Sequence, residues 1–152
     1  MVMTGTIQPV DGSCGRGAVT SDGGVTHSAY VCTDTWAASD PRLTGDASRP
    51  WSEDVHQTPD GVTSVGIEAA YVQNEGGGWA CSSAYVAKSA TPDHPVLEGT
   101  FTCRGSGGYE GLTVVLVTTP STEGYALDFD GLLFAGDLPA VFLDHIIIWS
   151  GA

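Results

Sequence analysis

Apolar and polar residues alternate along many short stretches of the chain, with the period of two that is typical of half-buried β-strands. The clearest example is residues 97–117. Phe101 and Cys103 alternate there with polar residues, a glycine-rich corner follows, and a β-branched run at 113–118 leads away from it. This stretch predicts a strand, a tight corner and a second strand, and we expect the rest of the sheet to be organised around it.

Similar alternation predicts further strands on both sides of this stretch. We expect them at residues 3–10, 15–20, 25–35, 62–73, 79–88 and 125–134. Turns rich in Gly, Asp and Pro separate them, and Ser21-Asp22-Gly23-Gly24 is a strong hairpin signal. Residues 42–48 also read as extended, but Pro50 predicts an edge or a bend there, with a loop or short strand at 51–57.

No segment keeps the 3.6-residue period of a helix, so the pattern predicts an all-β protein of about eight strands. Several strands, such as residues 112–117, are apolar on both faces. A closed antiparallel up-and-down barrel with a semi-apolar interior explains this, and so does a β-sandwich with an oligomer interface. We expect the barrel, as a single domain over residues 1–152.

The last part of that domain, residues 138–152, is predicted to be an apolar C-terminal extension. It contains the run Ile146-Ile147-Ile148-Trp149, which must be covered either by the domain or by another copy of the chain. No run approaches the ~18 apolar residues of a transmembrane helix, so no membrane span is expected. Residues 1–6 lack the charged and apolar regions of a signal peptide, which is therefore absent or already removed.

The charge balance is strongly acidic, with 18 Asp and Glu against 5 Lys and Arg and a formal net charge of −13. The basic residues are scattered, so no stripe of them could neutralise phosphates. Nucleic acid and anionic membranes are therefore unsuitable partners. The acidity is explained by solubility in salty or extracellular surroundings, or by an acidic docking face.

The four cysteines lack the CxxC spacing that zinc sites usually contain, so we expect no zinc site. Two disulfides are predicted instead, with the sequence-local pairs Cys14–Cys32 and Cys81–Cys103 favoured. Each would stabilise the fold by roughly 2–4 kcal/mol and would imply an oxidising, secreted or extracytoplasmic location. The alternative is a cytoplasmic protein with four buried free thiols.

Familiar catalytic and metal motifs are missing from the sequence. The glycine-rich corner lacks the Lys and the helix of a phosphate-binding loop, and there is no GxSxG or HExxH motif. We expect no cofactor, and no metal site either, because the histidines are far apart along the chain: His27, His56, His94 and His145. Asp128 and Asp130 share one strand face, where they could serve acid–base chemistry or bind calcium, or could simply be solvated.

Glu68 is the more informative carboxylate. It alternates onto a face otherwise made of Gly66, Ala70 and Val72, and these small residues would leave room for a ligand if that face is the barrel interior. A buried carboxylate there would have a raised pKa suited to proton transfer. The alternative is that this face is exposed.

One corner carries a family resemblance. The stretch Gly105-Ser106-Gly107-Gly108-Tyr109-Glu110-Gly111-Leu112 resembles the GxGxYxGL-type turn of the allene oxide cyclase-like barrels, which include dirigent proteins and bacterial spirotetronate cyclases. Residues 127–139 and 32–42 are also similar to segments of small, Cys-containing secreted bacterial β-proteins. The resemblance implies an eight-stranded barrel, often dimeric or trimeric, whose interior takes a hydrophobic small molecule. It transfers no catalytic residue.

Two functions are consistent with these features. The first is a cofactor-free cyclase that promotes an intramolecular cyclisation, of the [4+2] or Diels–Alder type, in a hydrophobic natural-product intermediate. Glu68 or Arg104 would polarise the substrate, and four aromatic residues would shape the pocket, of which the first three are expected to share one end of the barrel: Tyr71, Trp79, Tyr85 and Phe101. The second is a secreted, disulfide-stabilised, non-catalytic barrel that binds a ligand or forms homo-oligomers.

Overall fold

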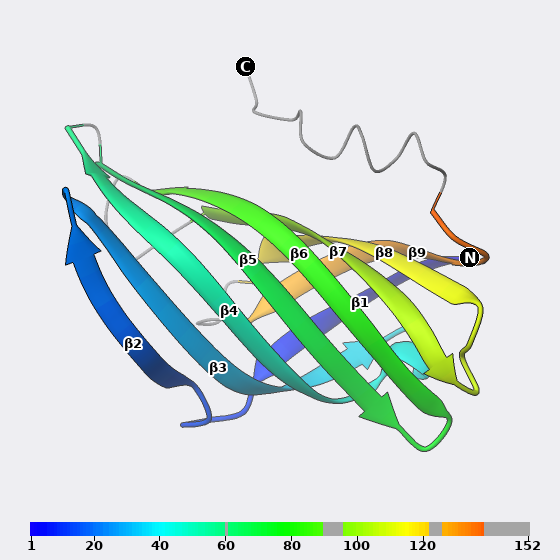
Figure 1. The fold of residues 1–152 in the computed structure, drawn as a ribbon. Coiled ribbons are helices and arrows are strands. Elements are labelled where there is room, and N and C mark those ends of the chain that lie inside the picture. Colours follow the sequence, from blue (N-terminus) through cyan, green and yellow to red (C-terminus); the bar gives the residue numbers. More distant parts are fainter. Residues whose placement is uncertain (60, 90–95, 122–125, 139–152) are drawn as a thin grey trace.

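The computed structural model describes residues 1–59, 61–89, 96–121 and 126–138, which form one antiparallel sheet (Figure 1). Its nine strands are β1 (Val2–Pro9), β2 (Gly15–Asp22), β3 (Val25–Ala38), β4 (Gly45–Thr58), β5 (Gly61–Asn74), β6 (Gly77–Ser89), β7 (Val96–Gly107), β8 (Leu112–Pro120) and β9 (Leu127–Ala135). A short 3-10 turn, η1 (Pro41–Leu43), lies between β3 and β4. Within the described residues no helix is long and apolar enough to cross a membrane.

The sheet closes on itself through its first strand. The strand order is β1-β9-β8-β7-β6-β5-β4-β3-β2, and β1 pairs additionally with β3, so that eight of the described strands form a hydrogen-bonded ring. β1 pairs with the second half of β3, and β2 pairs with its first half. The predicted all-β, eight-stranded antiparallel barrel is therefore confirmed as a barrel-like ring, with β2 as a ninth strand.

The strands are strongly staggered around this ring. Gly5 pairs directly with Ala38, but the pairings followed the other way round lead through Phe129, Thr118, Gly99, Tyr85, Gly66 and Glu53 to Ser28, ten residues from Ala38. Such a displacement requires strands that are steeply tilted against the barrel axis. An eight-stranded ring of this kind encloses an interior that side chains can fill, or that can hold one small ligand.

The alternation seen in the sequence places successive residues of each strand on the inner and the outer face of the ring in turn. The inner face forms the core, whose largest fully buried side chains include Trp36, Phe101, Met3, Ile7, Leu116 and Val72. The intervening residues face outward, and several apolar ones are exposed, among them Val65, Ile67, Tyr71, Val86, Val117 and Leu132. The apolar residues predicted on both strand faces therefore lie partly in the core and partly on the surface.

One predicted break in the sheet is wrong. β4 runs without interruption through Pro50 and includes the predicted loop at 51–57. Val31 of β3 pairs with Pro50, whereas on the β5 side the described pairs stop at Ser48 and resume at Trp51. Because proline removes only one backbone donor, a strand of 14 residues keeps enough partners on both sides to tolerate it.

Both predicted disulfides are confirmed, Cys14–Cys32 and Cys81–Cys103, and none of the four cysteines is free. Cys81 and Cys103 lie directly opposite each other on β6 and β7, in the core. Cys32 lies on the inner face of β3, and its partner precedes β2. The second bond therefore braces the ring, and the first ties the start of the ninth strand to it.

One end of the ring is closed by η1 and by the glycine-rich corner. Leu43 of η1 is fully buried, and the Trp79 indole donates to the Arg42 carbonyl at 2.7 Å. Tyr109 stacks on Trp79 with ring centroids 5.3 Å apart, and its hydroxyl donates to Asn74 Oδ1 at 2.6 Å. We call this region the closed end.

The predicted corner between β7 and β8 lies at this end. Gly107 and Gly111 have φ angles of 63° and 78°, which favour glycine. At Gly105 a Cβ atom would lie 2.0 Å from the Tyr109 carbonyl oxygen, so the chain turns back too tightly for a side chain there. Of the predicted C-terminal extension the structure describes only Leu138, and two of the histidines, His94 and His145, also lie outside the described residues.

Candidate functional site

Three charged side chains meet inside the ring. The Arg49 guanidinium donates to both carboxylate oxygens of Asp34, at 2.7 and 3.2 Å, and to Glu68 Oε1 at 3.1 Å. Their side chains are 6%, 0% and 11% exposed, in that order. A bidentate contact with one carboxylate and a single contact with another compensates the buried positive charge. We call these three residues the ion cluster.

The sheet register explains how residues far apart in the sequence come together. Arg49 lies on β4, between β3 and β5, and its side chain faces inward. Asp34 pairs with Ala47, and Glu68 pairs with Trp51, so each carboxylate is a diagonal neighbour of Arg49. Diagonal neighbours on one face of a sheet are within reach of a long side chain. The guanidinium therefore bridges three adjacent strands.

Burial and charge act against each other in this cluster. Burial alone would lower the pKa of Arg49, but the hydrogen bonds and charges of Asp34 and Glu68 outweigh it and raise that pKa. Burial raises the pKa of Glu68, and the charge and hydrogen bond of Arg49 offset only part of this effect. A carboxyl group with a raised pKa was predicted at Glu68, and the direction of the shift agrees.

Tyr85 occupies the space that the small neighbours of Glu68 were expected to leave. A Cβ atom on Gly66 would lie 2.4 Å from Tyr85 Cζ, so the tyrosine ring covers Gly66. Ala70, on the other side of Glu68, is fully buried in the core. The Tyr85 hydroxyl donates to Glu53 Oε2 at 3.1 Å, and burial, followed by the Glu53 charge, raises the pKa of Tyr85, so the phenol stays protonated.

Two stacked aromatic rings lie beside the ion cluster on the same inner face. Tyr30 of β3 and Trp51 of β4 are directly paired, and their half-buried rings stack with centroids 4.8 Å apart and 17° between their planes. The Arg16 guanidinium lies 5.8 Å from the Tyr30 centroid, and that of Arg49 lies 5.1 Å from the Trp51 centroid. We call Tyr30 and Trp51 the aromatic shelf.

The hydroxyl group of Ser83 lies on the strand next to Glu68 and has no hydrogen-bond partner among the described residues. Trp51 pairs with Glu68, which pairs in turn with Ser83 of β6. Ser83 Oγ is buried and has no hydrogen-bond partner among the described residues, and the same is true of Trp36 Nε1. Buried polar atoms are rarely left unpaired, so Ser83 Oγ could donate to or accept from a bound molecule or water, and Trp36 Nε1 could donate to one.

The predicted site residues do not form one pocket. Glu68, Trp79, Tyr85 and Phe101 face inward, but Tyr71 faces outward and is 54% exposed. Tyr71 therefore does not line the interior, because it alternates with the buried Val72. Trp79 and Tyr85 are six residues apart on β6, about 20 Å along a strand, so the three predicted aromatics do not share one end of the barrel.

Arg104 also faces outward. Its side chain is 54% exposed and forms an ion pair with Asp137. Asp128 and Asp130 are exposed on the outer face of β9, as expected for a solvated pair. His27 Nδ1 lies 2.5 Å from Asp54 Oδ1, a pair that is also half-exposed. Within the part of the chain that the structure describes, no group of three or more His, Cys, Asp or Glu residues could hold a metal ion.

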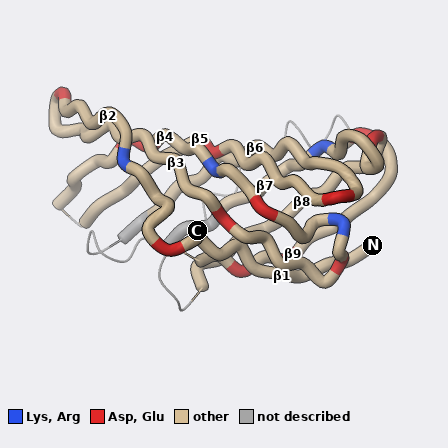
Figure 2. The backbone as a smooth tube through the Cα atoms, turned by 90° about the horizontal axis from the view of Figure 1, so that it is seen from below, with Lys and Arg blue, Asp and Glu red and all other residues tan. Residues whose placement is uncertain are grey.

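The sequence analysis did not predict the ion cluster. The signal was present, because Asp34 lies in phase with the apolar Cys32 and Trp36, and Arg49 lies in phase with Ala47. A charged residue at an inward position of a strand must be paired. The expected break at Pro50 concealed this phase in β4. Elsewhere Asp and Glu are scattered over the strands and turns, with few Lys and Arg between them (Figure 2).

No known protein family, curated protein or solved structure matches this chain. The likeness of the glycine-rich corner to allene oxide cyclase-like barrels therefore stays a prediction. The arguments on function below rest on the geometry of the ion cluster and the aromatic shelf.

Proposed function

We propose that the protein is a disulfide-stabilised, non-catalytic binding barrel, and that its ligand is an apolar small molecule with a positively charged nitrogen. The ligand docks on the aromatic shelf. The observation that carries this proposal is the arrangement of two guanidinium groups, from Arg16 and Arg49, against the stacked rings of Tyr30 and Trp51. The shelf already accepts cationic groups of the chain itself, and Arg16 is exposed enough to be displaced.

The surroundings of the shelf favour a cation over an anion. Aromatic ring faces attract positive charge, and an organic cation above such a ring gains roughly 0.5–2 kcal/mol. Asp34, Glu53 and Glu68 lie on the same inner face, against the two guanidinium groups of Arg16 and Arg49. The net charge of −13 also attracts cations to the molecule as a whole.

The pairing of the interior groups supports binding rather than catalysis. Asp34 and Glu68 are both bonded to Arg49, and the Tyr85 phenol is bonded to Glu53. A general acid or base must instead reach a proton on the substrate. Trp36, Phe101 and Phe129 fill the apolar interior, with centroid distances of 5.8 and 6.1 Å. A cyclisation of a hydrophobic intermediate, as predicted from the resemblance, needs room that these rings occupy.

The two disulfides support an extracytoplasmic location for this function. Disulfides persist in oxidising compartments and are rare where thiols are kept reduced. A small-molecule binder outside the cytoplasm needs a rigid frame, and the Cys81–Cys103 bond lies within the ring that carries the site.

The test is a titration of the full chain with phenethylammonium, in which isothermal titration calorimetry measures the binding affinity. Phenethyl alcohol and phenylacetate serve as neutral and anionic probes of similar shape. We expect the ammonium compound to bind most tightly, and Trp51→Ala to weaken its binding about tenfold. Tyr71→Ala removes an exposed aromatic ring on the outer face and should leave the affinity unchanged.

Two results would contradict the proposal. Equal affinity for the anionic probe, or an affinity that Trp51→Ala does not change, would exclude the shelf as a cation site. Recovery of chemically altered probe, detected by mass spectrometry, would contradict the non-catalytic assignment and would favour the cyclase hypothesis.

A further inference from the structure

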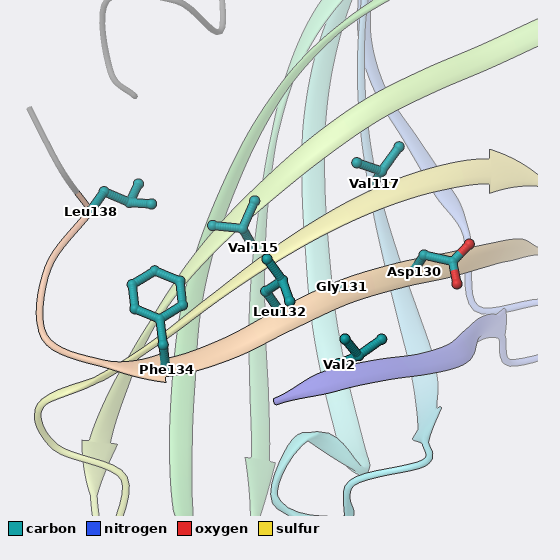
Figure 3. A pocket seen from close by; sticks show the side chains of 8 residues that line it. All are labelled: Val2, Val115, Val117, Asp130, Gly131, Leu132, Phe134 and Leu138. Atoms are coloured by element: carbon teal, nitrogen blue, oxygen red, sulfur yellow. The ribbon is translucent and has the colours of Figure 1, made fainter. Parts of the chain in front are cut away.

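The outer surface of β1, β8 and β9 contains an apolar hollow of about 540 Å³ (Figure 3). Asp130 is the one ionisable side chain in its lining, which consists of Val2, Val115, Val117, Asp130, Gly131, Leu132, Phe134 and Leu138. Val2, Val117 and Leu132 are each at least half exposed. We call this surface the β8–β9 face. A contiguous apolar surface of this kind on a protein in water usually marks a contact site.

The chain itself turns onto this face after β9. Gly136, with a φ of 93°, donates its N–H to the Gly111 carbonyl at 2.8 Å and accepts a bond from Thr113 Oγ1 at 2.6 Å. Two residues later the Leu138 side chain is buried and is part of the hollow, near Phe134 and Val115 (Figure 3). The last described residue of the chain thus already lies on the β8–β9 face.

The 14 residues that follow have the composition to continue this contact. Residues 139–152 carry Asp144 and His145 as their only ionisable side chains, and their large apolar residues are Val141, Phe142, Leu143, Ile146, Ile147, Ile148 and Trp149. An extended chain spans about 3.3–3.6 Å per residue, and neighbouring strands are about 4.8 Å apart. The segment is therefore long enough to cover all three strands of the face.

We propose that residues 139–152 dock on the β8–β9 face of the same chain. Leu138 anchors the segment at the edge of the hollow, which gives the following residues an effective concentration in the millimolar range for this surface. A second copy of the chain would have to displace a segment that is already attached beside its target. This inference is independent of the aromatic shelf, which lies on the inner face of β3 and β4.

The direct test is methyl NMR on the full chain. In a sample with all chains labelled, we expect nuclear Overhauser contacts from the Ile146, Ile147 and Ile148 methyl groups to Val115, Val117 and Leu132. In a 1:1 mixture of labelled and unlabelled chains, mixed in the unfolded state and refolded, an isotope filter retains contacts between chains only. We expect these contacts to disappear there.

The two alternatives give different spectra. Contacts that survive the isotope filter would show that a second copy covers the face, and the proposal would be wrong. Absence of the contacts from the fully labelled sample would show that neither the segment nor a second copy's segment docks there, which would also overturn it.

A matched pair of variants provides a second test. Leu132→Lys places a charge in the hollow, whereas Ile67→Lys places the same charge on the outer face of β5, where Ile67 is 66% exposed. Because cleavage by chymotrypsin follows the undocked population, Leu132→Lys should accelerate cleavage within residues 139–152 about tenfold. Ile67→Lys should not change the rate. Equal rates in the two variants would contradict docking on this face.

Discussion

The closed end differs in its side chains from the region of the ion cluster and the aromatic shelf, which we call the polar half of the ring. At the closed end, Trp79 and Tyr109 stack, and their polar atoms reach the Arg42 carbonyl and Asn74. In the polar half, Arg49 bridges two carboxylates beside the aromatic shelf. The groups that Trp79 and Tyr109 bond to at the closed end, a backbone carbonyl and an amide oxygen, are uncharged, whereas the polar half holds a buried cluster of charges.

β4 shows how abrupt this change is. Ala47 belongs to the apolar core, and the next two inward residues are Arg49 and Trp51 of the polar half. A buried ion cluster is often no more stabilising than apolar residues of the same volume, because its charges lose their hydration. The polar half is therefore an inefficient way to stabilise the fold, and it is the region in which we propose that the ligand binds. Three substitutions test this division.

The largest effect is expected for Arg49→Met. Asp34 and Glu68 would remain buried without their counter-charge, and we expect the free energy of unfolding to fall by about 3–5 kcal/mol. Urea denaturation monitored by circular dichroism measures this. Arg104→Met is the control, because it removes an exposed ion pair with Asp137 and should cost at most about 1 kcal/mol. Similar small losses in the two variants would mean that the ion cluster is not desolvated as described.

A smaller effect is expected at the closed end for Tyr109→Phe. It removes the hydrogen bond to Asn74 Oδ1 and keeps the stacking on Trp79, so we expect a loss of about 0.5–1.5 kcal/mol in the free energy of unfolding. Tyr71→Phe, on the exposed outer face, should be neutral. Phenethylammonium affinity should be unchanged by Tyr109→Phe. A loss of affinity as large as that of Trp51→Ala would show that the two regions are not separate.

The smallest effect concerns the pH dependence of Glu68→Gln. The pKa of Glu68 is raised above its ordinary value of 4.5, so the folded state holds the proton more tightly than the unfolded chain does. The stabilisation from that proton is present below the ordinary pKa and is lost as the pH rises through the folded-state pKa. The wild type should therefore lose stability relative to Glu68→Gln as the pH rises above the ordinary pKa of 4.5.

Thermal unfolding of both proteins in a series of buffers measures this difference. Glu110→Gln, an exposed control at the corner between β7 and β8, corrects for the change in net charge. A difference between wild type and Glu68→Gln that grows in the opposite direction would show that Arg49 outweighs burial at Glu68.

Local patterns in the sequence were enough to predict most of the fold. The period of two located the strands, and the Gly23-Gly24 hairpin is confirmed by φ angles of 56° and 83° at those glycines. The disulfides could be predicted because each joins cysteines only 18 and 22 residues apart, on or beside neighbouring strands. The same alternation placed Glu68 on one face with Gly66, Ala70 and Val72, but it left open whether that face points inward.

The site could not be predicted in the same way. Asp34, Arg49 and Glu68 lie on three strands, and which of their neighbours they meet depends on the register between those strands. Pro50 predicted a break in the strand, but β4 tolerates the proline and continues through it. Tyr71 was grouped with Trp79 because the two lie on either side of the Gly76–Gly78 hairpin, although the alternation places Tyr71 on the face opposite to Glu68, which is the outer face.

Sequence by itself therefore determined which segments are strands, which residues share a face and which cysteines pair, because these properties depend on neighbours along the chain. Tertiary structure alone decided that β1 closes the ring against β3, that η1 and the corner close one end, and that Arg49 meets two carboxylates beside Tyr30 and Trp51. Closure and stagger fix these contacts. They bring together residues whose separation along the chain carries no signal of their proximity.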